Sequence, residues 1–162
     1  MTIHHHEGDL PADVAFTGSV AIDTETMGLN PFRDAPCVVQ LSDGKGDAHV
    51  VRLKRPDYDC PNLKALVSNP RILKIFHFAR FDLGMIQQWL GAPCFPVYCT
   101  KIASRLARTY TDRHGLKDLS RELLNLDMSK AQQSSDWGAD KLSDAQLAYA
   151  CLLYTSPSPR DR

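Results

Sequence analysis

The sequence predicts an α/β protein with a mixed β-sheet flanked by helices. Three β-rich runs come first, at Val20–Asp23, Val38–Ser42 and Ala48–Leu53, and a turn rich in Gly and Asp separates the last two. Runs joined in this way are typical of a three-stranded antiparallel meander. Strand and helix patterns then alternate, which indicates further parallel strands joined by helices. With 162 residues, the chain is long enough for one domain with its own core.

Each expected element has a local signal. Val20–Ile22 is an apolar, β-rich run of the kind found in strands buried on both faces. Gly91 is expected to end one helix and Ser143 to cap another. His4–His6 are expected to form a surface segment leading into the domain. After the meander we expect a helix over Pro61–Ser68, a strand over Ile72–Phe76, a helix over Phe81–Leu90, a brief strand around Phe95–Tyr98, and helices at about Thr100–Arg108, Leu116–Leu124 and Ser143–Leu153.

Composition narrows the class of protein. Hydrophobic residues make up 43% and charged residues 23% of the chain, which is ordinary for a soluble globular protein. No apolar run approaches the roughly 18–20 residues that span a bilayer, and the N-terminal stretch lacks the apolar core of a signal peptide. Five cysteines without a CxxC pair suggest reduced thiols and a cytoplasmic location. The formal net charge of zero argues neither for nor against nucleic acid.

Two carboxylates follow the first buried run. Residues i and i+2 of a strand point to the same side, so Asp23 and Glu25 project together. They repel each other unless a positive group lies between them, and a hard divalent cation prefers such oxygen ligands. The alternative is an ordinary strand end whose acids are solvated or cap a turn.

Asp82 and Tyr149 are further candidates, on two of the expected helices. Asp82 lies in the first turn of its helix, where the helix dipole favours an acid whatever its function. If the strand Ile72–Phe76 lies beside Val20–Asp23, Asp82 arrives next to the other two acids, at a strand end where α/β sheets usually assemble their sites. Tyr149 lies about two turns into its helix, and a lone tyrosine is more often part of a core than a catalyst.

A local excess of basic residues lies between Lys101 and Arg121. Lys101, Arg105 and Arg108 have the spacing that places side chains on one helix face. Such runs are often solvated helix faces. Beside an acidic metal site, a basic stripe would instead contact the phosphates of a nucleic acid. The stretch contains two acidic residues, Asp112 and Asp118, and six basic ones: Lys101, Arg105, Arg108, Arg113, Lys117 and Arg121.

The combination resembles the ribonuclease D-like branch of the DEDD 3′–5′ exonucleases, the branch whose last motif contains a tyrosine. The segments Thr100–Lys117 and Gln132–Trp137 (QQSSDW) and the opening HHHEGDLP are similar to its compact single-domain bacterial members. The resemblance covers about Thr2 to Ala150, and several motifs in the same order make it more specific than any one of them. Its central motifs are Asp23-x-Glu25, Asp82 inside HFARFD, and Tyr149 after a Q-L-A run.

This resemblance implies a ribonuclease H-like fold and hydrolysis of phosphodiester bonds from the 3′ end of RNA, with release of nucleoside monophosphates. It implies two divalent cations, Mg²⁺ or Mn²⁺, that stabilise the attacking and the leaving oxygen. By position, Asp23 would bridge both ions, Glu25 would bind the ion that holds the nucleophilic water, and Asp82 the ion on the leaving-group side. Tyr149 would orient the water, because a phenol with an unperturbed pKa near ~10 is a poor base at neutral pH.

The resemblance also gives candidate contacts to the substrate. Phe78 and Phe81 could equally belong to the core. The candidates are Thr24, Met27, His77, Phe78, Phe81, Lys101, Arg105 and Lys117.

The sequence departs from the family after Ala150. The family places an aspartate four residues after the tyrosine, one helical turn on, and this chain has Leu153 there. From Cys151 the chain reads like translated adapter sequence, so we expect an exonuclease domain over residues 1–150 and a non-native tail over 151–162. A divergent terminus is the alternative. Without the fourth carboxylate, the chain as written should be weak or inactive.

Other classes of protein fit parts of the pattern. A non-catalytic nucleic-acid-binding module would keep the fold and the basic face, but it would have no need for three mutually repelling acids. A 3′–5′ exonuclease acting on single-stranded DNA, or a polymerase proofreading domain, shares the fold. No activating motif surrounds Cys37, Cys60, Cys94 or Cys99, which disfavours a thiol enzyme. The sequence leaves open RNA versus DNA, Mg²⁺ versus Mn²⁺ and the oligomeric state.

Overall fold

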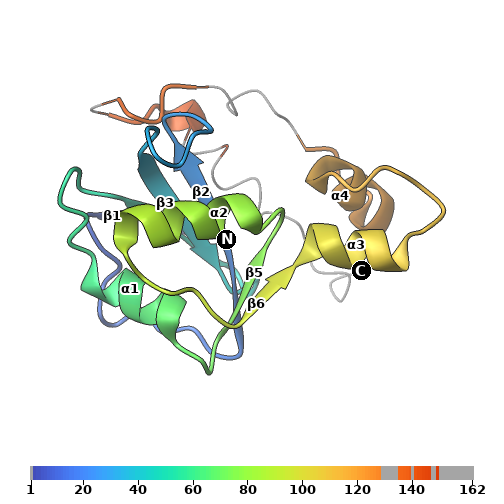
Figure 1. Cartoon of the computed structure of the whole chain (residues 1–162), viewed down its shortest axis with the longest axis horizontal. Coiled ribbons are helices and arrows are strands. Elements are labelled where there is room, and N and C mark those ends of the chain that lie inside the picture. The colour runs from blue at the N-terminus through green and yellow to red at the C-terminus, as the bar shows by residue number, and fades with distance from the viewer. Residues whose placement is uncertain (1, 129–134, 140, 147–148, 150–162) are drawn as a thin grey trace.

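The described residues form a six-stranded mixed sheet with helices against it. The computed structural model describes residues 2–128, 135–139, 141–146 and 149 (Figure 1). The strands lie side by side in the order β1-β4-β3-β2-β5-β6. They are β1 (Thr2–Glu7), β2 (Ser19–Thr26), β3 (Pro36–Ser42), β4 (Asp47–Arg52), β5 (Leu73–Phe76) and β6 (Val97–Cys99).

The centre of the sheet is the predicted antiparallel meander. β3 pairs antiparallel with β2 on one side and with β4 on the other. β5 then pairs in parallel with β2, and β6 in parallel with β5. β3 is buried at every position, which is why its sequence is nearly continuously apolar. The predicted α/β fold with a mixed sheet is confirmed.

The N-terminal histidines lie in a strand that the sequence did not predict. We expected His4–His6 to be a surface segment, but β1 pairs in parallel with β4 along the edge of the sheet. The strand is stabilised by ring stacking, since His4 and His6 lie 4.9 and 5.3 Å from His49, centroid to centroid. A run of three histidines carries little β-propensity. Its structure comes from the pairing with β4, which no local pattern reveals.

The helices are α1 (Pro61–Ser68), α2 (Arg80–Met85), the π-helical turn η1 (Ile86–Leu90), α3 (Thr100–Ala107) and α4 (Leu116–Leu124). In Figure 1, α1 and α2 lie over the sheet, while α3 and α4 stand to one side beyond β6. The helix predicted over Phe81–Leu90 thus begins one residue earlier and widens in its second half. It ends at Gly91, whose φ of 62° requires the left-handed conformation that glycine adopts easily.

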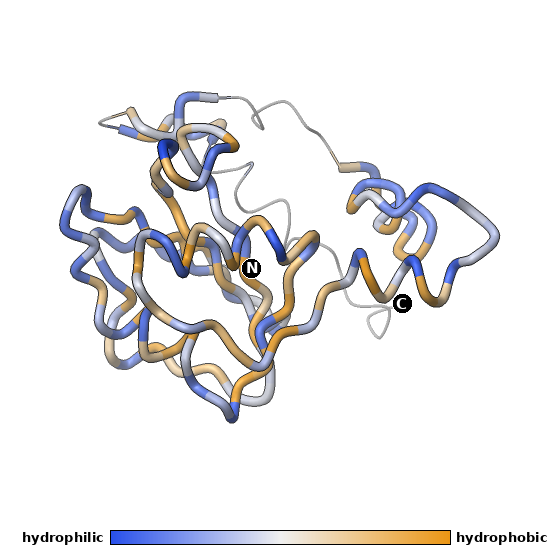
Figure 2. The backbone as a smooth tube through the Cα atoms, in the orientation of Figure 1, coloured by the Kyte–Doolittle hydropathy of each residue, from blue (hydrophilic) through white to orange (hydrophobic). Residues whose placement is uncertain are grey.

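The main core lies between the sheet and the helices that cover it. Along β2, Val20, Ile22 and Thr24 are buried and alternate with more exposed residues. Val20 and Ile22 belong to the same buried cluster as Leu63 of α1 and Ile86 of η1. Figure 2 shows the hydrophobic residues concentrated along the strands, whereas the loop between α3 and α4 is hydrophilic. The pleat of β2 therefore separates a core face from a face that is free to carry polar chemistry.

Lys74 of β5 forms hydrogen bonds to the loops that precede β5 and β6. Its side chain is fully buried, and the ammonium donates to the carbonyl oxygens of Asn69 at 2.5 Å, Ile72 at 2.8 Å and Phe95 at 2.5 Å. These carbonyls belong to the loops that enter β5 and β6. The lysine therefore donates to three backbone acceptors at this end of the sheet, of which the Asn69 oxygen also accepts from the N–H of Ile72 at 3.3 Å.

Two features of the described residues relate to the predicted class of protein. None of the helices in the described ranges is long and apolar enough to cross a membrane. Cys37, Cys60, Cys94 and Cys99 are free thiols. The cytoplasmic location stays a prediction. Leu153 and the tail over 151–162 lie outside the described residues.

Candidate active site

Asp23 and Glu25 lie within the last part of β2, because the strand continues to Thr26. Both side chains line a cleft of about 690 Å³. The cleft is walled by the end of β2 and the loop after it, the junction of β5 and α2, the first turn of α4, and Tyr149. A volume of this size is typical of small-ligand sites.

Asp82 reaches the same cleft from the first turn of α2. Because β5 pairs in parallel with β2, the helix that follows β5 begins beside the end of β2. The Asp82 carboxylate is 3% exposed. Its Oδ1 accepts hydrogen bonds from the backbone N–H of Thr24 at 3.0 Å and from the Thr24 hydroxyl at 2.7 Å. The structure thus brings all three predicted carboxylates together, and Thr24 fixes one of them.

The three acids are electrostatically costly where they lie. Burial, reinforced by the charges of Asp82 and Glu25, raises the pKa of Asp23 well above its usual range. Burial raises the pKa of Glu25 to about 7, opposed by a hydrogen bond from Gln40. Burial likewise raises the pKa of Asp82 to about 6, opposed by the Thr24 hydroxyl. Within the described part of the chain, none of the three forms an ion pair.

This donor set fits divalent cations. All the converging ligands are carboxylate oxygens, which hard cations such as Mg²⁺ and Mn²⁺ prefer. Among the described residues, no three His, Cys, Asp or Glu side chains are arranged around one common point. The three carboxylates line one cleft, but they do not by themselves surround a single ion position. Cations bound to these carboxylates would favour their ionised forms and so lower the pKa values that burial raises.

Tyr149 borders the same cleft and is partly buried. Burial, with the neighbouring charges of Glu25 and Asp23, raises the pKa of its phenol to about 12. The phenol is therefore protonated at neutral pH and can donate a hydrogen bond, but it cannot act as a base there. Its ring lies 6.2 Å from that of Trp137, centroid to centroid. Ser143 caps the start of this helix as predicted, since its hydroxyl accepts from the N–H of Gln146 at 3.2 Å.

Phe78 and Met27 present exposed apolar surface at the cleft. Phe78 is 51% exposed and Met27 57%. Phe78 also has a φ of 67°, which is strained for a side chain of its size and is held by the β5–α2 junction. Lys101 lies over its ring, with Nζ 4.4 Å from the centroid. Phe78 is therefore not a core residue, whereas Phe81 is partly buried in the cleft wall.

His77 lies in the cleft wall next to Phe78. Its Nδ1 is 3.0 Å from the Thr100 hydroxyl, which itself donates to the carbonyl oxygen of Phe76 at 3.1 Å. Because that hydroxyl proton is already committed, Nδ1 is the donor and Nε2 is left as an acceptor. Burial, followed by the charge of Lys101, lowers the pKa of His77. The neutral ring can accept a hydrogen bond from a substrate.

The predicted basic stripe is only partly formed. Lys117 lines the cleft from the first turn of α4, and Lys101 lies at its edge. Arg105 is exposed on α3, outside the cleft lining. Arg108 does not share that exposed face. It is 6% exposed, and its Nη1 donates hydrogen bonds to Ser104 Oγ at 2.9 Å and to the Arg113 carbonyl oxygen at 2.8 Å.

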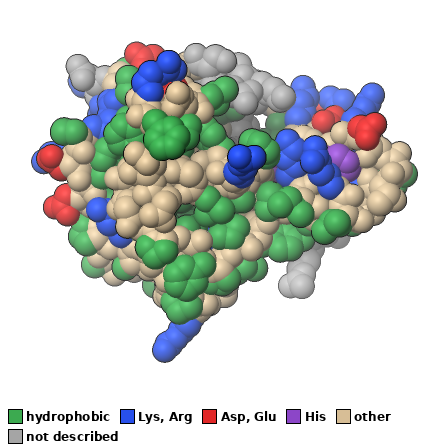
Figure 3. All heavy atoms as spheres, in the orientation of Figure 1, with side chains coloured by type: hydrophobic (Ala, Val, Ile, Leu, Met, Phe, Trp, Pro, Cys, Tyr) green, Lys and Arg blue, Asp and Glu red, His purple; other side chains and the backbone are tan. Residues whose placement is uncertain are grey.

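Arg108 also forms an ion pair with Glu122 of α4. Its expected place in the stripe was wrong because α3 ends at Ala107, so the backbone turns the next side chain inward. Figure 3 shows Lys and Arg side chains grouped on the side of the molecule that carries α3 and α4. The basic surface is therefore real but narrower than the sequence predicted.

Three residues near the site were not found from the sequence. Gln40 is fully buried opposite Asp23 in the β2–β3 pairing, with Nε2 3.4 Å from Glu25 Oε1. A single amide inside the run VVQLS is a signal that could have indicated it. Arg52 and Arg55 bind the segment that carries Trp137. More than eighty residues of chain separate these partners, so no local pattern could show the contact.

The fold and the cleft define a class. This is an α/β protein with a mixed sheet and an acidic site of the divalent-metal type, bordered by aromatic and basic side chains. The sequence model of a family described as 3′-5′ exonuclease matches residues 7–152. The chain belongs to this 3′–5′ exonuclease family.

Ribonuclease D proteins are among its curated relatives. The one from Acidiphilium cryptum is 36% identical over 136 residues, which cover 84% of this chain and 34% of that protein. The one from Gluconacetobacter diazotrophicus is 34% identical over the same coverage of 84% and 34%. The chain therefore spans about a third of the length of these relatives. The predicted ribonuclease D-like resemblance is confirmed.

Solved structures share most of this fold. Brucella melitensis NrnC with bound Mg²⁺ is 53% identical, with a TM-score of 0.87 over 93% of this chain and 73% of that one. The same protein bound to pGG is 54% identical, with a TM-score of 0.89 over 95% and 76%. Escherichia coli RNase D, at 24% identity, has a TM-score of 0.68 over 83% of this chain and 35% of that one, and it shows the fold alone. The ribonuclease H-like fold is thereby confirmed.

Proposed function

We propose that this chain is a metal-dependent 3′–5′ exoribonuclease, which hydrolyses phosphodiester bonds from the 3′ end of RNA and releases nucleoside monophosphates. The observation that carries the proposal is the convergence of Asp23, Glu25 and Asp82 in one cleft, without an ion pair among the described residues. A module that only bound RNA would gain nothing from this arrangement. Membership of the exonuclease family supports the proposal independently.

Asp23, Glu25 and Asp82 would hold two divalent cations, Mg²⁺ or Mn²⁺. Asp23 would contribute to both positions, Glu25 to the one beside the attacking water, and Asp82 to the one beside the leaving oxygen. Bound cations supply the positive charge that favours a nucleophilic hydroxide and stabilises the leaving oxygen. The Mg²⁺ bound in the structure of B. melitensis NrnC supports this choice of metal.

Tyr149 would orient the attacking water rather than deprotonate it. Its phenol, with a pKa of about 12, keeps its proton at neutral pH and offers it as a hydrogen-bond donor. Deprotonation of the water would then depend on the cations and on solvent. The pH dependence of the hydrolysis rate should therefore show no ionisation of Tyr149 near neutral pH.

The substrate would be the 3′ end of a short or single-stranded RNA. Phe78 and Met27 present apolar surface on which terminal bases can stack. Lys101, Arg105 and Lys117 would contact phosphates; Lys117 lines the cleft, Lys101 lies over the Phe78 ring at its edge, and Arg105 lies outside the cleft lining. The pGG bound to B. melitensis NrnC supports a substrate as short as a 5′-phosphorylated dinucleotide.

The test is a 5′-labelled single-stranded RNA incubated with and without Mg²⁺ or Mn²⁺. It compares the chain as written with its Leu153→Asp variant and with Asp23→Asn in both, and it includes a DNA of the same sequence. A descending ladder that requires metal, grows in Leu153→Asp and disappears with Asp23→Asn is expected. A ladder from DNA alone would move the assignment to a deoxyribonuclease. Binding of RNA without a ladder from any protein would instead establish a non-catalytic module.

A further inference from the structure

The segment 135–139 lies between Tyr149 and the end of β4. Its central residue, Trp137, is 2% exposed and is buried with Cys37, Val38 and Val50, and Tyr149 packs against this cluster. Val38 is the direct partner of Glu25 across the β2–β3 pairing. The two aromatic rings are tilted by 43° with centroids 6.2 Å apart. Trp137 therefore forms the support behind the tyrosine, next to the strand that carries the acids.

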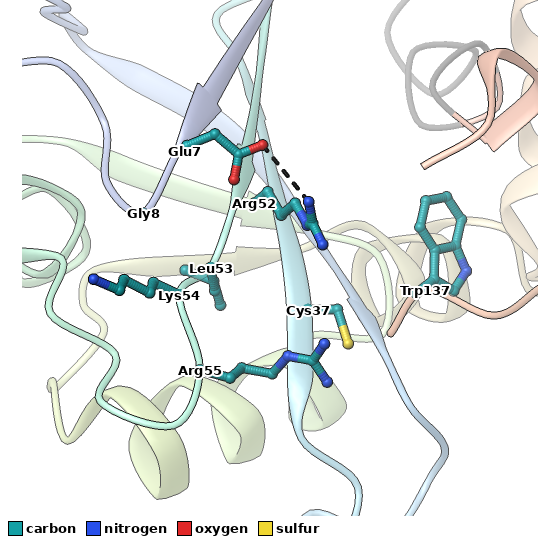
Figure 4. Close-up of a pocket in the computed structure, with 8 residues that line it drawn as sticks. All are labelled: Glu7, Gly8, Cys37, Arg52, Leu53, Lys54, Arg55 and Trp137. Atoms are coloured by element: carbon teal, nitrogen blue, oxygen red, sulfur yellow. Dashed lines mark ion pairs between the residues drawn. The ribbon is translucent and has the colours of Figure 1, made fainter. Parts of the chain in front are cut away.

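Two arginines hold this segment from the side of the sheet. Arg52, at the end of β4, donates from Nη2 to the Ala139 carbonyl oxygen at 2.9 Å. Arg55, in the loop after β4, donates from Nη2 to the Gly138 carbonyl oxygen at 2.8 Å. Figure 4 shows both guanidinium groups extending toward the segment with Trp137, while Lys54 between them in sequence points away.

The start of the Tyr149 helix is tied to the same segment. Gln146 is 6% exposed, and its Nε2 donates to the carbonyl oxygen of Asp136 at 2.9 Å and to Ser135 Oγ at 3.1 Å. Its Oε1 accepts from the N–H of Ser143 at 2.8 Å. Segment 135–139 is thus hydrogen-bonded on one side to the arginines at the end of β4 and on the other to Gln146, three residues before the tyrosine.

We propose that Arg52 and Arg55 are positioning residues for Tyr149, an inference that rests on the proposed function. By fixing the carbonyl groups of Gly138 and Ala139, the two guanidinium groups set Trp137 against the cluster on β3 and β4. Trp137 then fixes the tyrosine ring, and with it the direction in which the phenol donates into the cleft. Small displacements of an orienting group are costly in catalysis, because productive geometry is narrow.

Arg55 has a second contact that separates its role from that of Arg52. Its Nη1 lies 3.0 Å from Sδ of Met27, which lines the cleft. Arg52 has no such contact in the described residues, and its second partner is Glu7 at 3.9 Å, away from the cleft. Loss of Arg52 should therefore affect turnover alone, whereas loss of Arg55 should affect turnover and substrate binding.

The two arginines also line a pocket of about 400 Å³ with Lys54, so a direct contact to RNA phosphate is the competing explanation. The test compares Arg52→Met, Arg52→Lys, Arg55→Met and the matched control Lys54→Met. It uses whichever of the chain and its Leu153→Asp variant hydrolyses RNA. We expect a loss in kcat of about 10-fold or more for Arg52→Met with KM unchanged, partial recovery in Arg52→Lys, and no change in Lys54→Met. A rise in KM alone, together with a shallower dependence of KM on salt than in the parent protein, would overturn the proposal in favour of the phosphate contact.

A second readout does not depend on activity. The chain has two tryptophans, so 5-fluorotryptophan labelling gives two ¹⁹F resonances, which Trp89→Phe assigns. The Trp137 resonance should shift and broaden in Arg52→Met and Arg55→Met but not in Lys54→Met, with unfolding transitions confirming that each variant is folded. An unchanged Trp137 resonance in both arginine variants would refute the positioning role. If no protein hydrolyses RNA but this resonance moves, the support of Tyr149 stands and the proposed function fails.

Discussion

Replacing Thr24 by valine should weaken metal binding through a residue that touches no metal. The substitution keeps the shape of the side chain but removes the hydroxyl that donates to Asp82 Oδ1 at 2.7 Å, and it leaves the backbone N–H at 3.0 Å. Thr24 and Asp82 are 7% and 3% exposed, so water cannot easily replace the lost donor. A hydrogen bond to a charged group contributes about 1.5–3 kcal/mol. That corresponds to a fall in metal affinity of about 10- to 100-fold.

The effect should depend on pH in a defined direction. The Thr24 hydroxyl lowers the pKa of Asp82, which nevertheless lies at about 6 because of burial. Without the hydroxyl this pKa rises, so less of the carboxylate is ionised near neutrality and the loss of affinity is larger at pH 6 than at pH 8. The assay is calorimetric titration with Mg²⁺ and Mn²⁺ at both pH values, with Thr24→Ser as the control that keeps the donor. Equal affinity of Thr24→Val and the parent chain at both pH values would refute the reasoning.

The remaining predictions concern stability and the tyrosine. The raised pKa values of Glu25 and Asp82 mean that the folded state keeps protons that the unfolded chain releases. The metal-free protein should therefore become less stable to urea as the pH rises from ~4 to about 7, and saturating Mg²⁺ should reverse this trend. Lys74→Met, which removes the ammonium donor to the carbonyl oxygens of Asn69, Ile72 and Phe95 but leaves Asn69 its bond from the Ile72 N–H, should lower the unfolding free energy by about 2 kcal/mol or more, whereas the exposed Lys54→Met should change it little. Tyr149→Phe should lower kcat at least about 10-fold with KM nearly constant, and the pH–rate profile of the parent should show no phenol ionisation below pH ~10. If the unfolding free energy changed with pH in the same way with and without Mg²⁺, the three carboxylates would not be the metal site. An unchanged kcat in Tyr149→Phe would contradict the role of the phenol in orienting the water.

The sequence predicted the meander and the acids because their signals are local. Short β-rich runs and turn residues mark β2, β3 and β4, and the i, i+2 relation already places Asp23 and Glu25 on one side. The approach of Asp82 followed from one topological assumption, that β5 lies beside β2, and the parallel pairing bears that assumption out. The catalytic roles of these residues stay predictions.

What the sequence could not predict depends on contacts between distant segments. Arg108 has the spacing of an exposed stripe, but α3 ends before it and its guanidinium pairs with Glu122 of another helix. The hydrophobicity of Phe78 suggested a core residue as readily as a substrate contact, and only its strained backbone and exposure show which surface it forms. Arg52 and Arg55 appear as ordinary surface cations until their carbonyl partners, far along the chain, are known.

The histidine stack on β1 gives one edge of the sheet a sensitivity to acid. Burial and neighbouring imidazoles lower the pKa values of His6 and His49, with Asp13 opposing at His6 and Asp47 and Asp43 at His49. The unfolded value is near ~6.5, so protonation as the pH falls favours a state in which β1 has peeled away from β4. Among the described strands β4 is the only neighbour of β1, so the other five keep their pairing. Glu7 would leave Arg52 in the same event, and amide exchange that accelerates in β1 alone below pH 6 would record an edge that frays without the rest of the sheet.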